Sequence, residues 1–203
     1  TLALDLPGHG KSPPGGETGI DDFAVGLEAW HAGRRLGRAV WIGHSMGSAI
    51  VLALALRAPQ IVRALILIGS GPTLRVNPSL LERTAKAAGF QGAVEDILAW
   101  SFAPEAPARL TAAARRRMIE AGPDRLHADL AACDAFDAAA RLGEIDAPVL
   151  VVVGSRDRMT PPRQAEALRA GLRRARMETV DGAGHMVMLE QPTALAAVIR
   201  GFV

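Results

Sequence analysis

The 203-residue sequence contains one cysteine, no tyrosine and no long apolar run. Because Cys133 stands alone, the chain can form neither an intramolecular disulfide nor a metal site built from several thiolates. The longest apolar stretches, such as Ala49 to Leu56, fall far short of the ~20 residues that cross a bilayer. We therefore expect a globular, cytoplasmic protein with no membrane partner, since a reducing compartment is compatible with this cysteine content.

The sequence also lacks a strong excess of charge. It has 23 Lys and Arg residues against 21 Asp and Glu residues, and its formal net charge is +2. The basic residues are scattered among acidic ones, and no basic stripe alternates with aromatic residues, so we expect no nucleic-acid partner. No H-x-x-x-H or H-E-x-x-H spacing occurs, so we expect neither a metal nor another cofactor.

The most informative segment that is present is Gly43-His44-Ser45-Met46-Gly47. An apolar run, Ala39 to Ile42, precedes it, and a helix-forming apolar stretch, Ser48 to Ala58, follows it. A serine on a sharp turn from strand to helix has an exposed hydroxyl, and we expect the glycines two residues before and after it to allow the close approach. Ser45 is therefore a candidate nucleophile, and the backbone N–H of Met46 is a candidate oxyanion donor.

A serine nucleophile needs a histidine to accept its proton and a carboxylate to orient that histidine. The strand-like run Pro148 to Val153 leads into a loop that contains Asp157. A shorter run, Met177 to Val180, leads into a glycine-rich loop that contains His185. Loops at the carboxyl ends of strands hold the reactive groups of doubly wound sheets, and the chain order Ser, Asp, His is one that serine hydrolases use.

Other titratable residues are weaker candidates for the base or the acid. His44 adjoins the nucleophile, and adjacent side chains on a tight turn point apart. His9 lies in a glycine-rich turn, where we expect it to hydrogen-bond the loop backbone. His127, Asp134 and Asp137 belong to a region with a helical pattern throughout. We therefore assign the base to His185 and the acid to Asp157.

Four motifs together give the chain a resemblance to the α/β-hydrolase family. They are Asp5-Leu6-Pro7-Gly8-His9-Gly10-Lys11-Ser12, the turn around Ser45, the Asp157 loop and Gly182-Ala183-Gly184-His185. The resemblance implies an α/β fold with a doubly wound, mostly parallel sheet. It also implies that Ser45, Asp157 and His185 are the nucleophile, acid and base.

The resemblance also exposes a gap before residue 1. In the family, three strands and a loop with the second oxyanion donor precede the motif that begins at Asp5. We therefore predict that the chain is part of a longer protein, in which that donor and any signal peptide lie upstream. Thr1 to Leu6 would lack a neighbouring strand, and the strand before Ser45 would have an unpaired apolar edge. Such an edge predicts aggregation, pairing with another chain or rearrangement.

The pattern of elements divides the chain into two parts. Strand and helix patterns alternate over residues 1–71 and 144–203, which predict a discontinuous α/β-hydrolase core. Residues 72–143 show helical patterns only and resemble the cap that family members place over the active site. Trp100, Met118 and Phe136 are candidate walls of an acyl pocket, although such residues more often hold helices together.

Serine at position 45 narrows the expected chemistry. Family members that open epoxides or displace halide use aspartate at this position, so acyl transfer remains. We predict a carboxylic-ester hydrolase that acts on a small or medium ester without a cofactor. A lactonase, a carbon-carbon bond hydrolase and an acyltransferase stay open as alternatives, as does a catalytically silent ligand-binding module. The sequence does not specify an oligomeric state.

Overall fold

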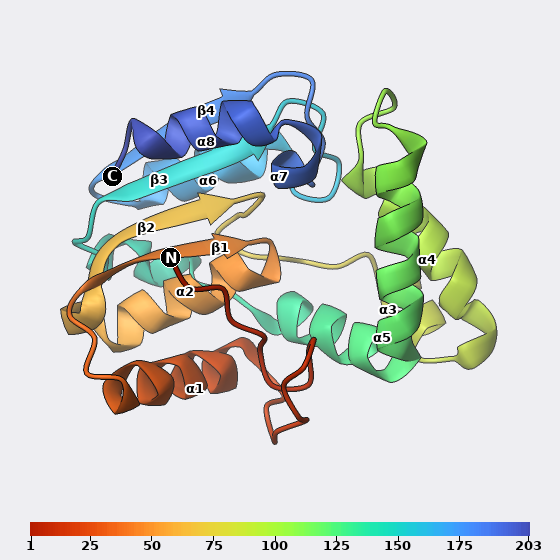
Figure 1. Ribbon diagram of the computed structural model, residues 1–203, viewed down its shortest axis with the longest axis horizontal. Coiled ribbons are helices and arrows are strands. Elements are labelled where there is room, and N and C mark those ends of the chain that lie inside the picture. The colour runs from red at the N-terminus through yellow and green to blue at the C-terminus, as the bar shows by residue number, and fades with distance from the viewer.

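The computed structural model describes residues 1–203, apart from the side chain at position 87. The described residues form a four-stranded sheet in the order β1 (Ala39–His44), β2 (Val62–Ile68), β3 (Val149–Gly154) and β4 (Ala175–Val180). All three neighbouring pairs are parallel, so the carboxyl ends of the strands share one edge of the sheet (Figure 1). The predicted α/β class with a parallel sheet is confirmed.

The two central strands are buried on both faces. Leu65 and Leu67 of β2 pack into one apolar cluster, while Ile66 and Ile68 pack into another on the opposite face. This two-sided burial explains why β2 and β3 appear in the sequence as apolar runs without polar alternation, interrupted only by Arg63 near the start of β2.

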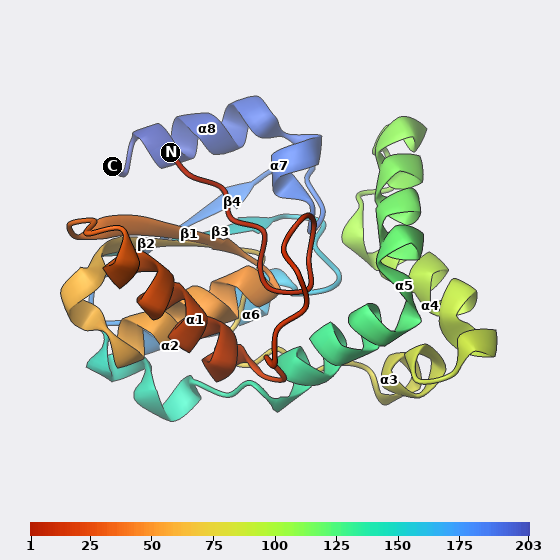
Figure 2. The same cartoon turned by 60° about the horizontal axis from the view of Figure 1, so that its bottom comes forward.

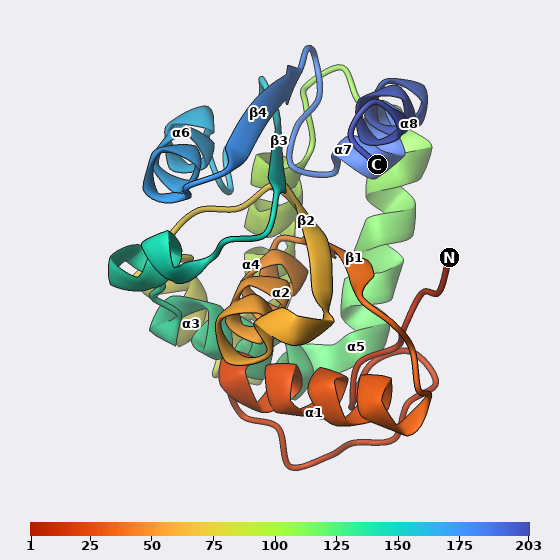
Figure 3. The same cartoon turned by 90° about the vertical axis from the view of Figure 1, so that its left-hand side faces the viewer.

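Helices cover both faces of the sheet (Figure 3). One face holds α1 (Ile20–Gly33), α2 (Met46–Arg57) and α6 (Pro162–Gly171), and the other holds α7 (Val187–Glu190) and α8 (Pro192–Arg200). Short 3₁₀ turns span Pro59–Ile61 and Ala139–Glu144. The helix α1 begins after Gly19, whose N–H donates to the Asp22 carboxylate at 3.0 Å, so Asp22 satisfies a backbone donor at the start of the helix.

Three helices between β2 and β3 stand at the carboxyl ends of the strands (Figures 1 and 2). They are α3 (Pro78–Thr84), α4 (Ala87–Ser101) and α5 (Ala108–Ala135). Gly122 has φ 82° and ψ 168°, so it interrupts α5 just before Pro123, a residue that disfavours a continuous helix. We call residues 72–143 the helical segment, and its status as a separate cap domain stays a prediction.

β1 lies at the edge of the sheet and pairs only with β2 among the described strands. Ile42, on its outer part, is 49% exposed. Thr1 to Leu6, which the sequence places beside a missing neighbour, forms no strand, since no described strand offers it a hydrogen-bonding partner. Among the described residues, no helix is long and apolar enough to cross a membrane.

Candidate active site

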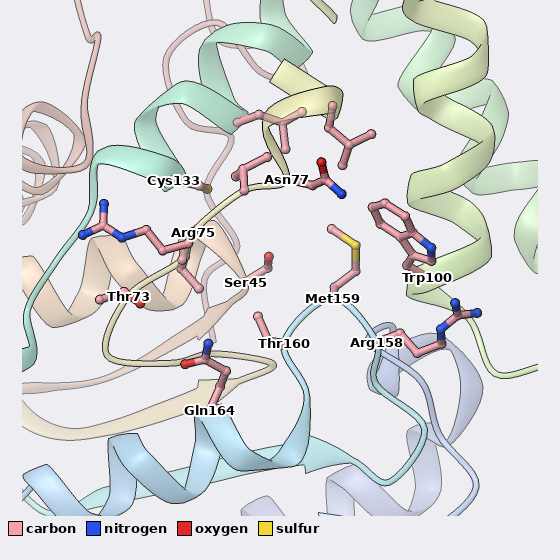
Figure 4. Close-up of a pocket in the computed structure, with 14 residues that line it drawn as sticks. Ser45, Thr73, Arg75, Asn77, Trp100, Cys133, Arg158, Met159, Thr160 and Gln164 are labelled. Carbon is pink, nitrogen blue, oxygen red and sulfur yellow. The ribbon is translucent and has the colours of Figure 1, made fainter. Parts of the chain in front are cut away.

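Ser45 occupies the sharp turn between β1 and α2. Its backbone has φ 52° and ψ −119°, in a left-handed region that non-glycine residues rarely adopt. The Ser45 N–H donates to the carbonyl of Ile68 at the end of β2, at 2.9 Å, and so ties the strained turn to the sheet. The half-buried hydroxyl has no hydrogen bond to a described residue, and Figure 4 shows it pointing into a pocket.

The two glycines of this turn are not equivalent. A Cβ atom on Gly43 would lie 2.3 Å from the carbonyl oxygen of Gly47 and 2.5 Å from the nitrogen of Ser48. A Cβ atom on Gly47 would meet nothing within 4 Å. The expectation that both glycines are needed for the close approach is therefore wrong for Gly47, whose backbone is the surface against which Gly43 packs.

Met46 begins α2 directly after the serine. No hydrogen bond from its N–H to a described residue is present, as expected for the first N–H of a helix. This N–H is therefore available to a ligand atom beside the Ser45 hydroxyl.

Asp157 lies in the loop after β3 and is only 3% exposed. Its Oδ1 atom accepts hydrogen bonds from the N–H groups of Met159, at 2.9 Å, and Thr160, at 2.8 Å. Its Oδ2 atom accepts from the Thr160 hydroxyl at 2.8 Å and lies 2.8 Å from Nδ1 of His185. The carboxylate is thus fixed in place by three donors in addition to the imidazole.

His185 lies in the loop after β4 and is also 3% exposed. Its Nδ1 atom faces Asp157 Oδ2 and, at 3.1 Å, the Thr160 hydroxyl oxygen. Because a carboxylate only accepts, the proton of a neutral imidazole belongs on Nδ1, and Nε2 is left as the basic atom. The His185 N–H donates to the Ser101 carbonyl at 2.8 Å, which connects this loop to the end of α4.

The structure brings Asp157 and His185 into contact, and it places Ser45 at the same edge of the sheet, at the end of β1, with β2 between β1 and β3. Gly69, which follows Ile68, packs against the His185 ring, and a Cβ atom there would lie 2.9 Å from Nδ1. No hydrogen bond joins Ser45 to His185 among the described residues. Hydrogen bonds between catalytic groups are often long without substrate and tighten when it binds.

His44 supports the histidine loop and does not contact the serine hydroxyl. Its Nε2 atom donates to the backbone carbonyl of His185 at 3.0 Å, and the two rings lie 4.6 Å apart. Burial, and next the neighbouring His185, lowers the pKa of His44 from 6.5 to about 3. His44 is therefore neutral at physiological pH.

The other rival residues lie in contacts of their own. His9 bonds the Pro7 carbonyl at 3.0 Å, as expected for a loop histidine, but it also bonds Asp129 of α5 at 2.9 Å, which the sequence did not indicate. His127 bonds the hydroxyl of Thr84 at 3.1 Å. Asp134 accepts from the Val76 N–H, and Asp137 pairs with Arg75.

A cavity of about 460 Å³ opens beside Ser45, which is a usual size for a small-molecule site (Figure 4). The helical segment supplies much of its lining, and the loop after β3 and the start of α6 supply the rest. The apolar lining residues are Leu74, Val76, Leu80, Trp100, Leu130, Cys133 and Met159, and the polar ones besides Ser45 are Thr73, Arg75, Asn77, Arg158, Thr160 and Gln164.

Of the three predicted wall residues, only Trp100 lines this cavity. Met118 of α5 packs against α3 and α4, and Phe136 packs into the main core, as residues that hold helices together do. Cys133 lines the cavity, but burial raises the pKa of its thiol to about 12, so it is not a competing nucleophile.

Within the part of the chain that the structure describes, no group of three or more His, Cys, Asp or Glu residues is arranged to hold a metal ion. Sequence reasoning missed Thr160, although a threonine three residues after a loop aspartate commonly returns a hydrogen bond to it. It also missed Arg158, whose place in the cavity depends on how the loop after β3 folds.

Comparisons with known proteins identify relatives over nearly the whole chain. The model of the alpha/beta hydrolase family matches residues 1–198. A pimeloyl-[acyl-carrier protein] methyl ester esterase from Neisseria meningitidis serogroup B (strain MC58) is 31% identical over 220 residues, which cover 99% of this chain and 81% of the relative.

Solved structures also resemble the chain over nearly its whole length. A thermophilic esterase has a TM-score of 0.88 and 35% identity, covering 98% of this chain and 78% of its own. An N-acyl homoserine lactone degrading enzyme has a TM-score of 0.89 and 26% identity, covering 98% of this chain and 81% of its own.

Proposed function

The chain belongs to the α/β-hydrolase family and is a carboxylic-ester hydrolase, and we propose that Ser45, His185 and Asp157 carry the reaction. The observation that supports this most directly is the buried 2.8 Å contact between Asp157 and His185 at the edge of the sheet where the Ser45 turn also lies. A carboxylate in this position stabilises the imidazolium that forms when the histidine accepts a proton.

In the proposed reaction, Nε2 of His185 removes the proton of the Ser45 hydroxyl as the oxygen attacks the ester carbonyl. The N–H of Met46 donates to the oxyanion that develops, where a fixed donor is worth more than water. The imidazolium then protonates the departing alcohol, and a water activated by His185 releases the acid from Ser45.

The cavity beside Ser45 is the proposed acyl site. Its apolar wall, which includes Leu80, Trp100 and Met159, suits the hydrocarbon part of a small or medium ester. Helices over such a site exclude water and strengthen the electrostatic contacts within it, which is the cap role that we propose for the helical segment.

A fluorophosphonate probe tests the nucleophile, and ester hydrolysis tests the reaction. The wild-type protein should be labelled at Ser45 and should hydrolyse simple esters. The Ser45→Ala variant should lose labelling and lose at least about four orders of magnitude in kcat. A folded wild-type protein that is neither labelled nor active would instead indicate a ligand-binding module.

The same chemistry opens a lactone, because a lactone is an internal ester. The relative whose structure is named as an N-acyl homoserine lactone degrading enzyme makes this the second candidate. Comparing kcat/KM for a lactone with that for the matching open-chain ester decides between the two.

A further inference from the structure

The lining of the cavity beside Ser45 contains basic residues but no acidic residue. Fourteen residues line it, of which Arg75 and Arg158 are cationic and none is aspartate or glutamate. An enzyme site that offers cations and no carboxylates favours a ligand with negative charge.

The two arginines differ in how far their charges are already neutralised. Arg75 donates to the carboxylate of Asp137 at 3.1 Å and to the backbone carbonyl of Asp134 at 2.8 Å. Arg158 has no ion pair and no side-chain hydrogen bond to any described residue. The uncompensated charge of the cavity is therefore that of Arg158.

The acidic residue next to Arg158 in the sequence is occupied elsewhere. Asp157 is buried and bonded to Thr160 and His185. Its carboxylate cannot turn toward the Arg158 guanidinium without giving up these bonds.

The surroundings of Arg158 also suggest how a substrate would lie. In the view of Figure 4, Trp100, Met159 and Arg158 are drawn on the same side of Ser45, and all of them line the cavity. Met159 and Trp100 offer apolar surface, so a hydrocarbon chain could run along them from an ester at Ser45 to a charged group at Arg158.

We propose that Arg158 binds an anionic group of the substrate, and that the enzyme prefers esters that carry a carboxylate or a phosphate remote from the scissile carbonyl. This inference rests on the proposed function and names its substrate class. A guanidinium suits both anions because its planar array of donors matches two oxygens at once, which a single ammonium does not.

Matched esters test the proposal in the full chain. Monomethyl esters of the dicarboxylic acids from adipate to sebacate are compared with methyl esters of equal length that end in a methyl group or in a phosphonate. The wild-type kcat/KM should be higher for the anionic esters by about fivefold or more at low salt, and the advantage should shrink as salt is added. The carboxylate and phosphonate arms show which anion is preferred.

Three variants locate the effect. Arg158→Gln should lower kcat/KM for the anionic esters by about five- to tenfold, mainly through KM, and should lower that for the neutral esters much less. Arg158→Lys should keep part of the preference. Arg156→Gln removes a neighbouring arginine that is exposed, as Arg158 is, but does not line the cavity, so this variant should keep the preference in full.

Two results would overturn the proposal: an unchanged ratio of anionic to neutral rates in Arg158→Gln, or an equal loss in Arg156→Gln. A binding measurement separates this failure from failure of the proposed function. Calorimetric binding of sebacate to Ser45→Ala should be weakened about five- to tenfold by adding Arg158→Gln, whether or not the wild-type protein turns over esters. Hydrolysis of neutral esters without any charge preference would leave the proposed function standing and reject only this inference.

Discussion

The acid and base of the candidate site are held in a different way from the nucleophile. Asp157 and His185 are buried and fixed by hydrogen bonds to side chains, chiefly those between the carboxylate, the imidazole and the Thr160 hydroxyl. Ser45 is half-exposed, its hydroxyl bonds no described residue, and only its backbone is fixed. The difference matters because each arrangement is sensitive to a different kind of substitution.

The positions of Asp157 and His185 should be sensitive to the change of a single polar atom, even when the side-chain volume stays the same. The position of Ser45 should tolerate nearby polar changes, but not an added methyl group where strand and helix are in contact. The buried pair therefore determines the protonation state of the base, while the turn determines where the nucleophilic oxygen lies. Four substitutions test this division, in order of decreasing expected effect.

Asp157→Asn should have the largest effect. Asparagine keeps an oxygen for the N–H groups of Met159 and Thr160, so the loop should fold, but its amide cannot stabilise the imidazolium of His185. We expect kcat for an ester to fall about 10⁴-fold, with a thermal midpoint within a few degrees of the wild-type value. Asp181→Asn, in the exposed loop after β4, is the matched control and should stay near the wild-type rate. A loss of less than tenfold in Asp157→Asn would contradict the assigned acid.

Gly43→Ala should distort the backbone of the turn that carries Ser45. Its Cβ atom would lie 2.3 Å from the Gly47 carbonyl oxygen, so strand and helix must separate. We expect the free energy of unfolding to fall by about 3 kcal/mol and kcat to fall with it, because the serine is displaced. Chemical denaturation and ester hydrolysis measure the two effects.

Gly47→Ala is the control for this prediction, since its Cβ atom would meet nothing within 4 Å. Alanine also favours a helix over glycine by up to about 1 kcal/mol. Stability should therefore stay the same or rise slightly. Equal damage from the two substitutions would show that the turn needs both glycines, as the sequence motif alone suggests.

Lowering the pH should destabilise the fold through His44, which is neutral in the folded chain. The folded chain binds a proton at His44 only near pH 3, whereas the unfolded chain binds one near pH 6.5. Between these values the unfolded state holds more protons, so this contribution to stability is fully present above pH 6.5 and falls as the pH is lowered, by about 1.4 kcal/mol per pH unit.

The substitution His44→Gln tests this contribution. Glutamine keeps an N–H donor for the His185 carbonyl but does not titrate. The fall in unfolding free energy between pH 6.5 and 5, about 2 kcal/mol from His44, should therefore be smaller in the variant. Denaturant titrations at several pH values measure it, and parallel curves for the two proteins would refute it.

The sequence predicted those parts of the site that depend on local pattern. Ser45, Asp157 and His185 each follow an apolar run, and parallel strands bring their carboxyl ends to one edge. Local pattern also accounts for the break in α5 at Gly122 and Pro123, because both residues disfavour a continuous helix.

The remaining details depend on contacts that pattern does not encode. A motif treats Gly43 and Gly47 alike, and only the folded backbone shows which hydrogen faces the neighbouring chain. The bond from His9 to Asp129 spans 120 residues, and no periodicity relates them. Arg158 reaches the cavity only because residues far along the chain complete its other walls.

Thr160→Val should give the smallest effect and the sharpest test of side-chain positioning. Valine has nearly the shape of threonine but lacks the hydroxyl that donates to Asp157 Oδ2 at 2.8 Å and lies 3.1 Å from His185 Nδ1. Without that donor the carboxylate can rotate, so we expect kcat to fall about tenfold with KM unchanged.

Thr160→Ser keeps the hydroxyl and removes only a methyl group, so it should restore most of the lost rate. If serine were as damaging as valine, packing would matter more than the hydrogen bond. If valine were harmless, the two backbone N–H groups on Oδ1 would be enough to hold Asp157. The imidazole proton resonance of His185 reports the same change without turnover, and it should shift in the valine variant but not in the serine variant.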